Sequence, residues 1–395
     1  MMPGPLAGFR IIDVTQMISG PMATGLLADQ GADVIKVEPP GTGDLTRALG
    51  GGQRRISPTF TVVNRNKRSV VLNLKEPRGL ELLKRLVATA DLFVQNFRPG
   101  VAEHMGIGEA ALREVKPNLV YVSISGFGEK GPYTHKRVYD PVIQALSGLA
   151  SIQADPKTGR PNMMRLIIPD KVTALTAAQA MTAALLARER TGQGQHVRLA
   201  MLDAVVSFLW PEAMALHTFV TEKEVVTRPA SRDLVFETLD GYITVGTVSD
   251  AEWSGLTRAL ERPEWLEDPR FKTVPGRVKY TDARLELVAE VLKTKTSAEW
   301  LARLDAEQVP CAPVQTREEL LTDPQIAVNE LIVESDHPHL GRVRQPRPAA
   351  RFDVTSPELL RIPAPKLGEH TEAVLAEIGV SVEQLRELRE AGVIA

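Results

Sequence analysis

The stretch FRIIDVTQMISGPMATGLLADQGADVIKVE, residues 9–38, decides the fold. Its two ends, FRIIDV (9–14) and ADVIKVE (32–38), are rich in the branched apolar residues that are typical of buried strands. Between them Gly20 and Pro21 mark a turn, and ATGLLADQG indicates a helix that stops at Gly31, a residue type favoured just after a helix. Strand, helix and strand in so short a stretch predict a βαβ unit, and therefore a parallel sheet with helices packed on it.

The same alternation continues outward from this unit. SVVLNL (69–74) and DLFVQN (91–96) predict strands with an amphipathic helix between them at 76–90, and NLVYVSIS (118–125) is β-rich again. Residues 1–200 therefore predict a Rossmann-like, doubly wound α/β domain.

The next part of the chain predicts a long helix and then a change of domain. Segment 171–190 is apolar around almost its whole circumference, so we expect a helix buried on most sides. QHVRLAML (195–202) returns as a strand. The composition then shifts to a strand at 239–247 and charged helical segments, which place a smaller α+β domain at 225–330. The tail predicts a loop followed by one helix within 364–379.

Composition excludes several classes of protein. The 395 residues carry a formal net charge of −2, so no global positive field favours nucleic acid or anionic membranes as a partner. The single cysteine, Cys311, permits no intramolecular disulfide and fits a reducing compartment. The first residues show no signal-peptide pattern, and the longest uncharged apolar run, 172–187, is too short to span a bilayer. We expect a soluble, cytoplasmic protein.

Two motifs that suggest bound cofactors are weak. GFGEKG (126–131) matches G-x-G-x-x-G, but the fingerprint for dinucleotides needs a helix to begin at the third glycine, and Gly131 is followed by Pro-Tyr-Thr-His. His337, His339 and Cys311 have no further clustered ligand of suitable spacing, so no metal site is predicted.

Basic residues in predicted loops and strand ends suit a phosphorylated cofactor. Ligands of a parallel α/β sheet bind outside the carboxyl ends of its strands, where Lys and Arg supply charge-assisted hydrogen bonds to phosphate. The alternative interpretation is ordinary solvated surface charge. The residues concerned are Arg65, Lys67, Arg68, Lys75, Arg98, Lys136 and Arg137.

Asp170 has two compatible interpretations. It follows Pro169 and precedes the long helix, so it suits the N-cap position, where Asp is a preferred residue. A helix N-terminus also favours the anion, and a carboxylate in a poorly solvated pocket can act as a covalent nucleophile. Position alone leaves both interpretations open.

The chain as a whole resembles the class III CoA transferases of the CaiB/BaiF type. The matching stretches run in the family's order from about residue 8 to 375 and include residues 9–44, NRNKRSVVLNLK, QNFRPGVAEHMG, VYVSISGFGEKGPY, YDPVIQALSG, ARERTGQGQHVRLAMLDAV, VPCAPV and LGEHT. The resemblance implies one large domain built from residues 1–224 and 331–395, with the small domain 225–330 inserted. It also implies a homodimer of interlocked chains.

The resemblance assigns roles to the candidate site. It implies that Asp170 is the nucleophile, while Asp140 lies at another family position, and that Gln16 lies beside the thioester. Coenzyme A thioesters are implied as substrates, with no permanently bound cofactor. The implied CoA-contacting residues are Ile18, Ser19, Leu72, Asn73, Leu74, Lys75, Asn96, Phe97, Arg98, His104, Lys136, Arg137 and Tyr139. Two positions depart from the pattern: Pro39 and His104 stand where some members have arginine.

Three interpretations of function follow. The first is transfer of CoA from an acyl-CoA to a free carboxylic acid, one partner being a small dicarboxylate such as succinate. Arg165 either binds a substrate carboxylate or forms a structural salt bridge. The second is an α-methylacyl-CoA racemase, whose histidine is replaced here by Tyr139; tyrosine, with an ordinary pKa of about 10, is a poor base at neutral pH. The third is an acyl-CoA-binding protein without turnover, in which Asp170 serves only as a cap. The region after Val226 also lacks the glycine-rich loop of some relatives.

Overall fold

The computed structural model describes residues 4–49, 56–220, 233–357 and 361–395, and the chain divides into two compact units. The large unit comprises Met1–Gln153, Asn162–Thr218 and Glu330–Ala395. The small unit comprises Ala154–Pro161 and Phe219–Asn329.

The large unit is built on a six-stranded parallel sheet in the order β3-β2-β1-β4-β5-β6, which confirms the predicted parallel α/β fold. Its strands are β1 (Arg10–Asp13), β2 (Asp33–Glu38), β3 (Lys67–Val71), β4 (Leu92–Gln95), β5 (Val120–Ser125) and β6 (His196–Ala200). The chain winds one way from β1 to β3 and returns through β4 to β6. The strand order therefore reverses between β1 and β4, where loops at the carboxyl ends separate and leave room for a ligand.

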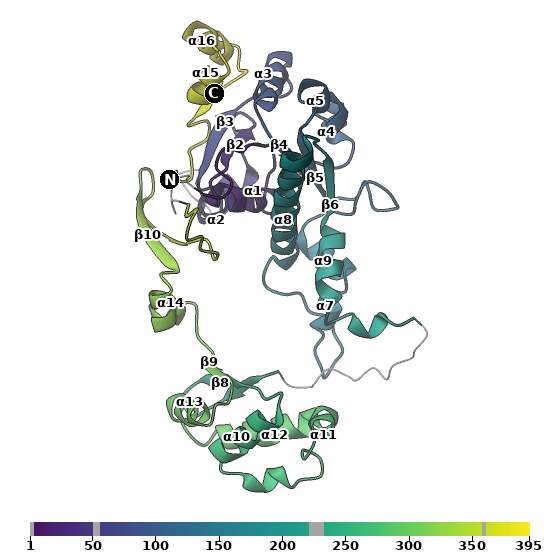
Figure 1. Ribbon diagram of the computed structural model, residues 1–395, viewed down its shortest axis with the longest axis vertical. Helices are drawn as coiled ribbons and strands as arrows, with labels where there is room; N and C mark the ends of the chain where they lie inside the picture. Colours follow the sequence, from purple (N-terminus) through teal and green to yellow (C-terminus); the bar gives the residue numbers. More distant parts are fainter. Residues whose placement is uncertain (1–3, 50–55, 221–232, 358–360) are drawn as a thin grey trace. The chain divides into compact units, whose positions relative to one another are not determined.

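Helices cover both faces of this sheet (Figure 1). On one face, α1 (Ser19–Asp29) lies beside α8 (Ile168–Thr191) and packs with it against the apolar side chains of the strands. The helices on the other face are α3 (Pro77–Ala88), α5 (Glu109–Val115), α15 (Thr371–Glu377) and α16 (Val382–Glu390). The helix predicted within 364–379 is α15, and a second helix that was not predicted, α16, follows it after a turn at Gly379.

The predicted burial of the long helix on most sides is confirmed except along one stripe: within 172–187 only Leu175, Gln179, Ala183 and Leu186 are exposed. Helix α8 buries a stripe of small residues such as Ala174, Ala177 and Ala184 against α1 and the sheet. Leu175 and Leu186 on the opposite side are 56% and 51% exposed. Apolar residues therefore surround α8 as the sequence indicated, but one face of the helix has no covering element within the described chain.

Shorter elements complete the large unit. They are α2 (Pro58–Val63), α4 (Val101–His104), α6 (Asp140–Leu146), α7 (Leu149–Ile152), α9 (Met201–Leu209), the 3-10 helices η1 (Leu45–Ala48) and η2 (Ala215–His217), and the hairpin of β10 (Ile332–His337) and β11 (Gly341–Pro346). No helix begins at Gly131: residues 126–139 run through turns to α6, so the geometry of a dinucleotide fingerprint is absent from this loop. Within the described residues no helix is both long and apolar enough to cross a membrane.

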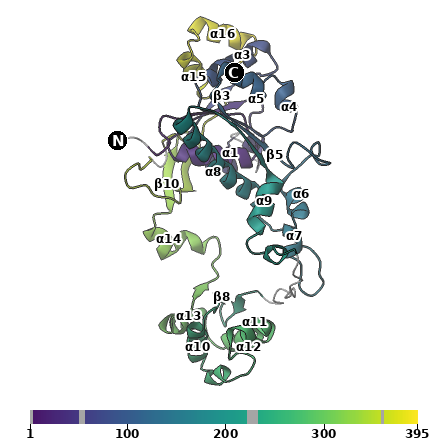
Figure 2. The same ribbon diagram turned by 45° about the vertical axis from the view of Figure 1, so that its right-hand side comes forward.

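The small unit combines an antiparallel sheet with helices. Its strands are β7 (Val235–Glu237), β8 (Tyr242–Val245) and β9 (Cys311–Pro313), and its helices α10 (Asp250–Ala259), α11 (Val274–Lys279), α12 (Thr281–Leu292), α13 (Ser297–Ala306) and α14 (Pro324–Val328), with 3-10 helices η3 (Pro263–Leu266) and η4 (Glu319–Thr322). Figure 2 shows α10, α11, α12 and α13 gathered near β8. Trp253 stacks on Trp265 at a centroid distance of 6.1 Å, and both belong to a core that includes Trp300.

Candidate active site

A cleft of about 410 Å³ opens at the carboxyl ends of β1, β4 and β5, where the strand order reverses. This is where ligands bind in open α/β sheets. The cleft is lined by Gln16, Met17, Ser19, Asn96, Phe97, Arg98, Pro99, Ile124, Ser125, Gly126, Phe127, Thr134, Lys136, Arg137, Val138, Tyr139, Asp170 and Met201. Nine of the residues assigned from the sequence are among them.

Asp170 is not the N-cap of α8. The helix begins at Ile168 and places Asp170 in its first turn, while the N-cap position belongs to Ile167 and has no side-chain cap. Proline is tolerated in the first helical turn, so Pro169 allows the helix to start earlier than its position suggested. No backbone group of α8 takes up the Asp170 carboxylate as a cap. The side chain reaches the cleft.

The Asp170 carboxyl group is hard to ionise for two reasons. Burial, followed by the negative charge of Asp140, raises its pKa to about 6, although hydrogen bonds from the backbone N–H and hydroxyl of Ser19 oppose the shift. The N-termini of α1 and α8 both lie at this carboxylate and also favour the anion. Asp170 is therefore mostly ionised at pH 7, but more basic than an exposed aspartate.

Asp140 lies beneath the cleft and does not line it. It is 4% exposed at the start of α6, where one carboxylate oxygen accepts the Asp170 backbone N–H (3.3 Å) and the other accepts the Gln144 amide (2.7 Å). Asp140 therefore has fixed hydrogen bonds and no access to a substrate from the cleft. It acts on Asp170 through its charge.

We expect Asp140→Asn to shift the acidic limb of the pH–rate profile to lower pH. Burial and Asp140 raise the pKa of Asp170, so loss of the like charge lowers that pKa and keeps Asp170 ionised in more acidic solution. A less basic nucleophile is also weaker, and the plateau kcat/KM should fall, by about tenfold or less. Profiles of kcat/KM from pH 4.5 to 8 check this, with Asp336→Asn at an exposed position of β10 as the control. A limb that stays in place contradicts the coupling of the two carboxylates.

The loop after β1 is held in a strained form that faces Asp170. Met17 has a φ of 70°, in the left-handed region that costs a non-glycine residue free energy. Its N–H donates to Asp44 (3.2 Å), and the Asn96 amide clamps both the N–H (2.9 Å) and the carbonyl (2.8 Å) of Gln16. The Asn96 side chain is thus engaged with the protein itself. The clamp leaves the Gln16 side chain, which makes no hydrogen bond to the described residues, to line the cleft next to Ser19.

Two fully buried lysines tie this loop to the sheet. Lys36 pairs with Asp44 (2.8 Å), and Lys67 pairs with Asp13 (3.1 Å). Lys36 also donates to the carbonyl of Thr15 (2.9 Å), and Lys67 to that of Pro21 (2.8 Å), which are backbone groups on either side of the strained turn. The loop geometry therefore depends on charges buried behind the cleft.

The basic stretch NRNKRS is neither a phosphate site nor solvated surface, so both predictions for it are wrong. Its cations point into the protein and are neutralised there, because the C-terminal segment and α1 bring carboxylates onto the edge of the sheet. The partners are Asp29 for Arg65, Asp13 for Lys67, and Asp33 with Glu377 for Arg68.

The cleft rim, by contrast, carries three cations without a carboxylate partner in the described chain. Arg98, Lys136 and Arg137 are exposed; Lys136 lies over the Tyr133 ring at 4.1 Å. Unpaired cations beside a cleft attract an anionic ligand. These residues retain the phosphate-binding potential that NRNKRS lacks.

Several residues assigned from the sequence lie outside the cleft. Leu72 is 1% exposed and part of the core, Leu74 packs against that core, and Asn73 donates its backbone N–H to the Val393 carbonyl (2.8 Å). Ile18 is buried at the start of α1, and Lys75 and His104 are exposed on other surfaces. Arg165 is exposed, does not line the cleft and forms no ion pair with the described residues.

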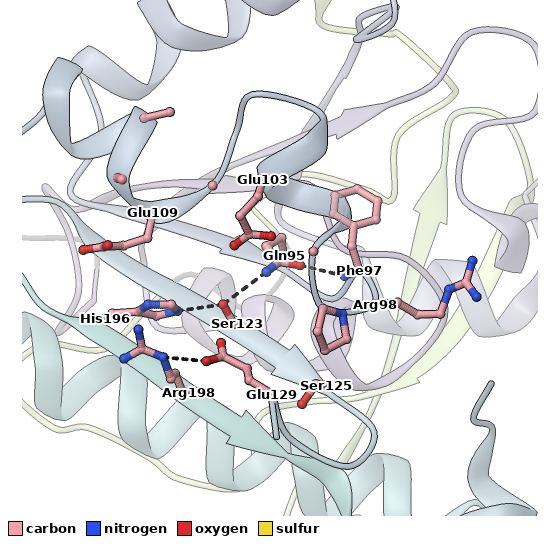
Figure 3. Close-up of a pocket in the computed structure, with 15 residues that line it drawn as sticks. Gln95, Phe97, Arg98, Glu103, Glu109, Ser123, Ser125, Glu129, His196 and Arg198 are labelled. Atoms are coloured by element: carbon pink, nitrogen blue, oxygen red, sulfur yellow. Dashed lines mark hydrogen bonds and ion pairs between the residues drawn. The ribbon is translucent and has the colours of Figure 1, made fainter. Parts of the chain in front are cut away.

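A second pocket, of about 530 Å³, adjoins the cleft and shares Phe97, Arg98, Pro99 and Ser125 with it (Figure 3). A chain of hydrogen bonds crosses its floor: the Phe97 N–H donates to Gln95 (2.7 Å), Gln95 to Ser123 (3.1 Å), and Ser123 contacts His196 Nε2 (2.7 Å). A backbone N–H can only donate, so Gln95 accepts through its carbonyl oxygen and donates through its amide to Ser123. The direction of the Ser123–His196 contact depends on the histidine tautomer, and His196 Nδ1 is buried without a hydrogen-bond partner among the described residues. This chain anchors the backbone of the rim loop 96–98.

Sequence reasoning missed Asp44 and the Gln95–Ser123–His196 chain. Both act between segments far apart in the sequence, and no local motif marks them. The only signal in the sequence was the single aspartate of GTGDLTRA. The histidines singled out earlier are structural: His337 is buried and bonds to the Ala364 carbonyl (3.0 Å). No cluster of three metal-ligating side chains exists among the described residues.

Fold and cleft together define a CaiB/BaiF-type α/β protein. A CaiB/BaiF family protein from Brucella suis has a similar structure, with a TM-score of 0.81 and 31% identity, covering 95% of this chain and 100% of that one. The chain belongs to CoA-transferase family III, whose sequence profile matches residues 6–371.

Relatives of known activity agree. The succinyl-CoA:glutarate CoA-transferase of Homo sapiens is 33% identical over 397 residues, covering 99% of this chain and 90% of the relative. The formyl-CoA:oxalate CoA-transferase of Escherichia coli is 32% identical over 422 residues, covering 98% of this chain and 99% of the relative. The protein is an enzyme, a family III CoA-transferase.

Proposed function

We propose that this CoA-transferase moves CoA from an acyl-CoA donor to a free carboxylic acid, with Asp170 as covalent nucleophile. The observation that supports this most directly is the Asp170 carboxylate. It lines the cleft at two helix N-termini, and its pKa is raised to about 6. Such a group is ionised at neutral pH and still basic enough to attack a thioester.

In the first half-reaction, a carboxylate oxygen of Asp170 attacks the thioester carbonyl carbon. The carbon–sulfur bond breaks, and CoA leaves as a thiolate. The acyl group stays on Asp170 as a mixed anhydride. The thiolate then attacks the Asp170 carbonyl carbon, which releases the donor acid as a carboxylate and leaves an aspartyl-CoA thioester. The acceptor carboxylate then attacks the aspartyl-CoA thioester and forms a second mixed anhydride with release of CoA thiolate. The thiolate attacks the acceptor carbonyl carbon of this anhydride, which yields the new acyl-CoA and regenerates Asp170. One difficult exchange thus becomes four acyl transfers.

Gln16 is proposed to stabilise the charge that develops on the thioester oxygen. Its backbone is fixed by Asn96, while its side-chain amide has no partner among the described residues. A pre-positioned donor of this kind costs no reorganisation during the reaction. The hydrogen bonds from Ser19 are proposed to hold the Asp170 carboxylate in place during the attack.

Arg98, Lys136 and Arg137 are proposed to hold the phosphates of CoA, because they are the cations at the cleft rim that no carboxylate neutralises. The contacts assigned to Ile18, Leu72, Asn73, Leu74, Lys75 and His104 remain predictions; for Leu72, whose side chain is buried, only backbone contact is available. The large unit is thus the proposed CoA-binding domain.

We propose a small dicarboxylate such as succinate as one acid in the exchange. The names of the human and Escherichia coli relatives contain glutarate, succinyl and oxalate, all dicarboxylic groups. Arg165, which is exposed, lacks an ion pair in the described chain and precedes Asp170 by five residues, is available for a second carboxylate.

The assay that tests the proposal incubates the enzyme in D2O with acyl-CoA donors, including a 2-methylacyl-CoA, and a pool of carboxylic acids. Mass spectrometry of the CoA esters should show new thioesters only when acceptor acids are present. Deuterium gained at the α-carbon without a new thioester would instead establish the racemase. Tyr139, at the racemase histidine position, is 63% exposed at the cleft rim and favours transfer.

We further propose a cytoplasmic homodimer in which a second copy covers the open side of α8. Leu175 and Phe208 are 56% and 59% exposed and line an apolar groove of about 380 Å³ between α8 and α9. An apolar patch of this kind is typical of an interface. The proposed dimer is one in which the two chains interlock.

Phe208→Asp should therefore convert the dimer to monomer, because a charge is costly to bury in an apolar interface. Light scattering on a sizing column measures the molar mass. Val382→Asp, at a 77% exposed apolar position on α16, is the control and should remain dimeric. A Phe208→Asp protein with unchanged mass would place the interface elsewhere.

A further inference from the structure

Arg284 is a partly buried cation without a counter-charge in the described chain. The four buried arginines each pair with a carboxylate: Arg47 with Glu38, Arg65 with Asp29, Arg188 with Asp91, and Arg277 with Asp250. Arg284 on α12 has only the Thr247 hydroxyl, 3.5 Å from Nη1, and its Nε is buried without a hydrogen-bond acceptor. Taking a guanidinium out of water without a partner is costly, so such a group usually serves a ligand.

The surroundings of Arg284 are apolar and carry excess positive charge. It lines a pocket of about 130 Å³ whose floor is the side chains of Phe236, Val245, Leu256, Leu285 and Val288, each 5% exposed or less. Leu234 and Val248 form an exposed apolar rim. Burial, and then the charge of Arg277, lower the pKa of Arg284. No carboxylate is among the side chains that line the pocket.

These features select the chemistry of the ligand. A guanidinium matches the planar geometry of a carboxylate. Phosphate would place further charge and acceptor oxygens against the apolar floor, where no donor other than Arg284 and Thr247 is available among the side chains that line the pocket. The pocket is far too small for CoA but fits a short alkyl chain. We propose that the small unit binds a short aliphatic monocarboxylate, such as butyrate, between Arg284 and this apolar floor.

All residues of this pocket lie within 234–288 of the small unit, and none of them lines the Asp170 cleft. The proposal therefore goes beyond CoA transfer and does not rest on it.

Saturation-transfer NMR with the full-length protein and butyrate tests the proposal. We expect saturable binding to wild type, at least a tenfold loss of affinity in Arg284→Met, and unchanged binding in Arg258→Met, an exposed arginine of α10 paired with Glu307. Butanol, which matches the chain but lacks the charge, should not bind detectably. Equal binding of butanol, displacement of butyrate by equimolar inorganic phosphate, or full affinity in Arg284→Met would each overturn the proposal; butyrate bound in the Asp170 cleft would give the last of these.

The stability of Arg284→Met provides a second readout. Because the substitution removes an unpaired charge and keeps most of the volume, its Tm without ligand should equal or exceed that of wild type. Butyrate should raise the Tm of wild type but not of the variant. A marked loss of Tm in the variant without ligand would mean that Arg284 has a structural partner, and the proposed site would be wrong.

Discussion

Asp170→Asn should abolish CoA transfer and leave acyl-CoA binding within about twofold of wild type. The amide keeps the shape of the carboxylate and can still accept the hydrogen bonds of Ser19, so the cleft should retain its form. It cannot form the anhydride, and removal of a covalent nucleophile typically costs on the order of 10⁴-fold or more in rate. The turnover rate from the thioester assay and the affinity from calorimetry measure the two effects separately.

The control for this substitution is Asp336→Asn, an exposed aspartate of β10, which should keep full activity. Asp170→Ala checks that residual activity does not come from deamidation of the asparagine. In wild type, hydroxylamine should trap the aspartyl thioester as a hydroxamate on the Asp170 peptide. Transfer by Asp170→Asn near the wild-type rate, or a hydroxamate on Asp140 instead, would rule out the assigned nucleophile. Wild-type protein that binds acyl-CoA as tightly as Asp170→Asn but shows no turnover would point to a binding protein.

The sheet was predictable from the sequence because its signals are local. The run from Phe9 to Glu38 places two apolar strands around a turn and a helix, and each piece can be read without knowing what it contacts. The cleft followed from the same pattern, since parallel strands present their loops on one edge. Asp170 stood out because a charged residue interrupts an apolar stretch.

Charge partners were not predictable, since they join segments far apart in the chain. Lys67 and Arg68 look like a basic surface in sequence, but they meet Asp13, Asp33 and Glu377 only after the sheet and tail assemble. The exact start of α8 was also missed, because Pro169 is compatible with both the last loop residue and the first helical turn. In both cases the local sequence was compatible with two structures, and contacts with distant parts of the chain determine which one forms.

The raised pKa of Asp170 depends on the two buried lysines, because they hold the loop that faces its carboxylate. Asp170 gains basicity from burial and from Asp140, while Ser19 and two helix N-termini keep it ionised. This balance requires the loop of Gln16 and Ser19 to stay in place despite the strained φ of Met17. A packed apolar core could not hold that loop by its backbone, because backbone carbonyls need donors. Lys36 and Lys67 supply them.

Lys67→Met should lower the free energy of unfolding by about 3–5 kcal/mol, which is typical when one partner of a buried ion pair is removed. Four acceptors, on Asp13, Pro21, Thr24 and Asn64, lie 2.8–3.1 Å from Lys67 Nζ and share its three N–H donors. Burial alone would raise the pKa of Asp13, and the charges of Lys67 and Lys36 with hydrogen bonds from Thr15 and Thr24 reverse this, so the variant leaves a buried carboxylate without the largest of these compensating interactions. Urea unfolding followed by circular dichroism measures the loss.

Two further variants separate a buried pair from charge in general. Lys272→Met breaks an exposed pair with Glu267 and should cost about 1 kcal/mol or less. The double variant Asp13→Asn/Lys67→Met should be less destabilised than the sum of its single substitutions, because the orphaned charge is removed together with its partner. If Lys67→Met cost no more than Lys272→Met, the lysine would contribute little to folding. Its only remaining role would be to hold the Pro21 carbonyl, and the variant would then lose turnover without losing stability.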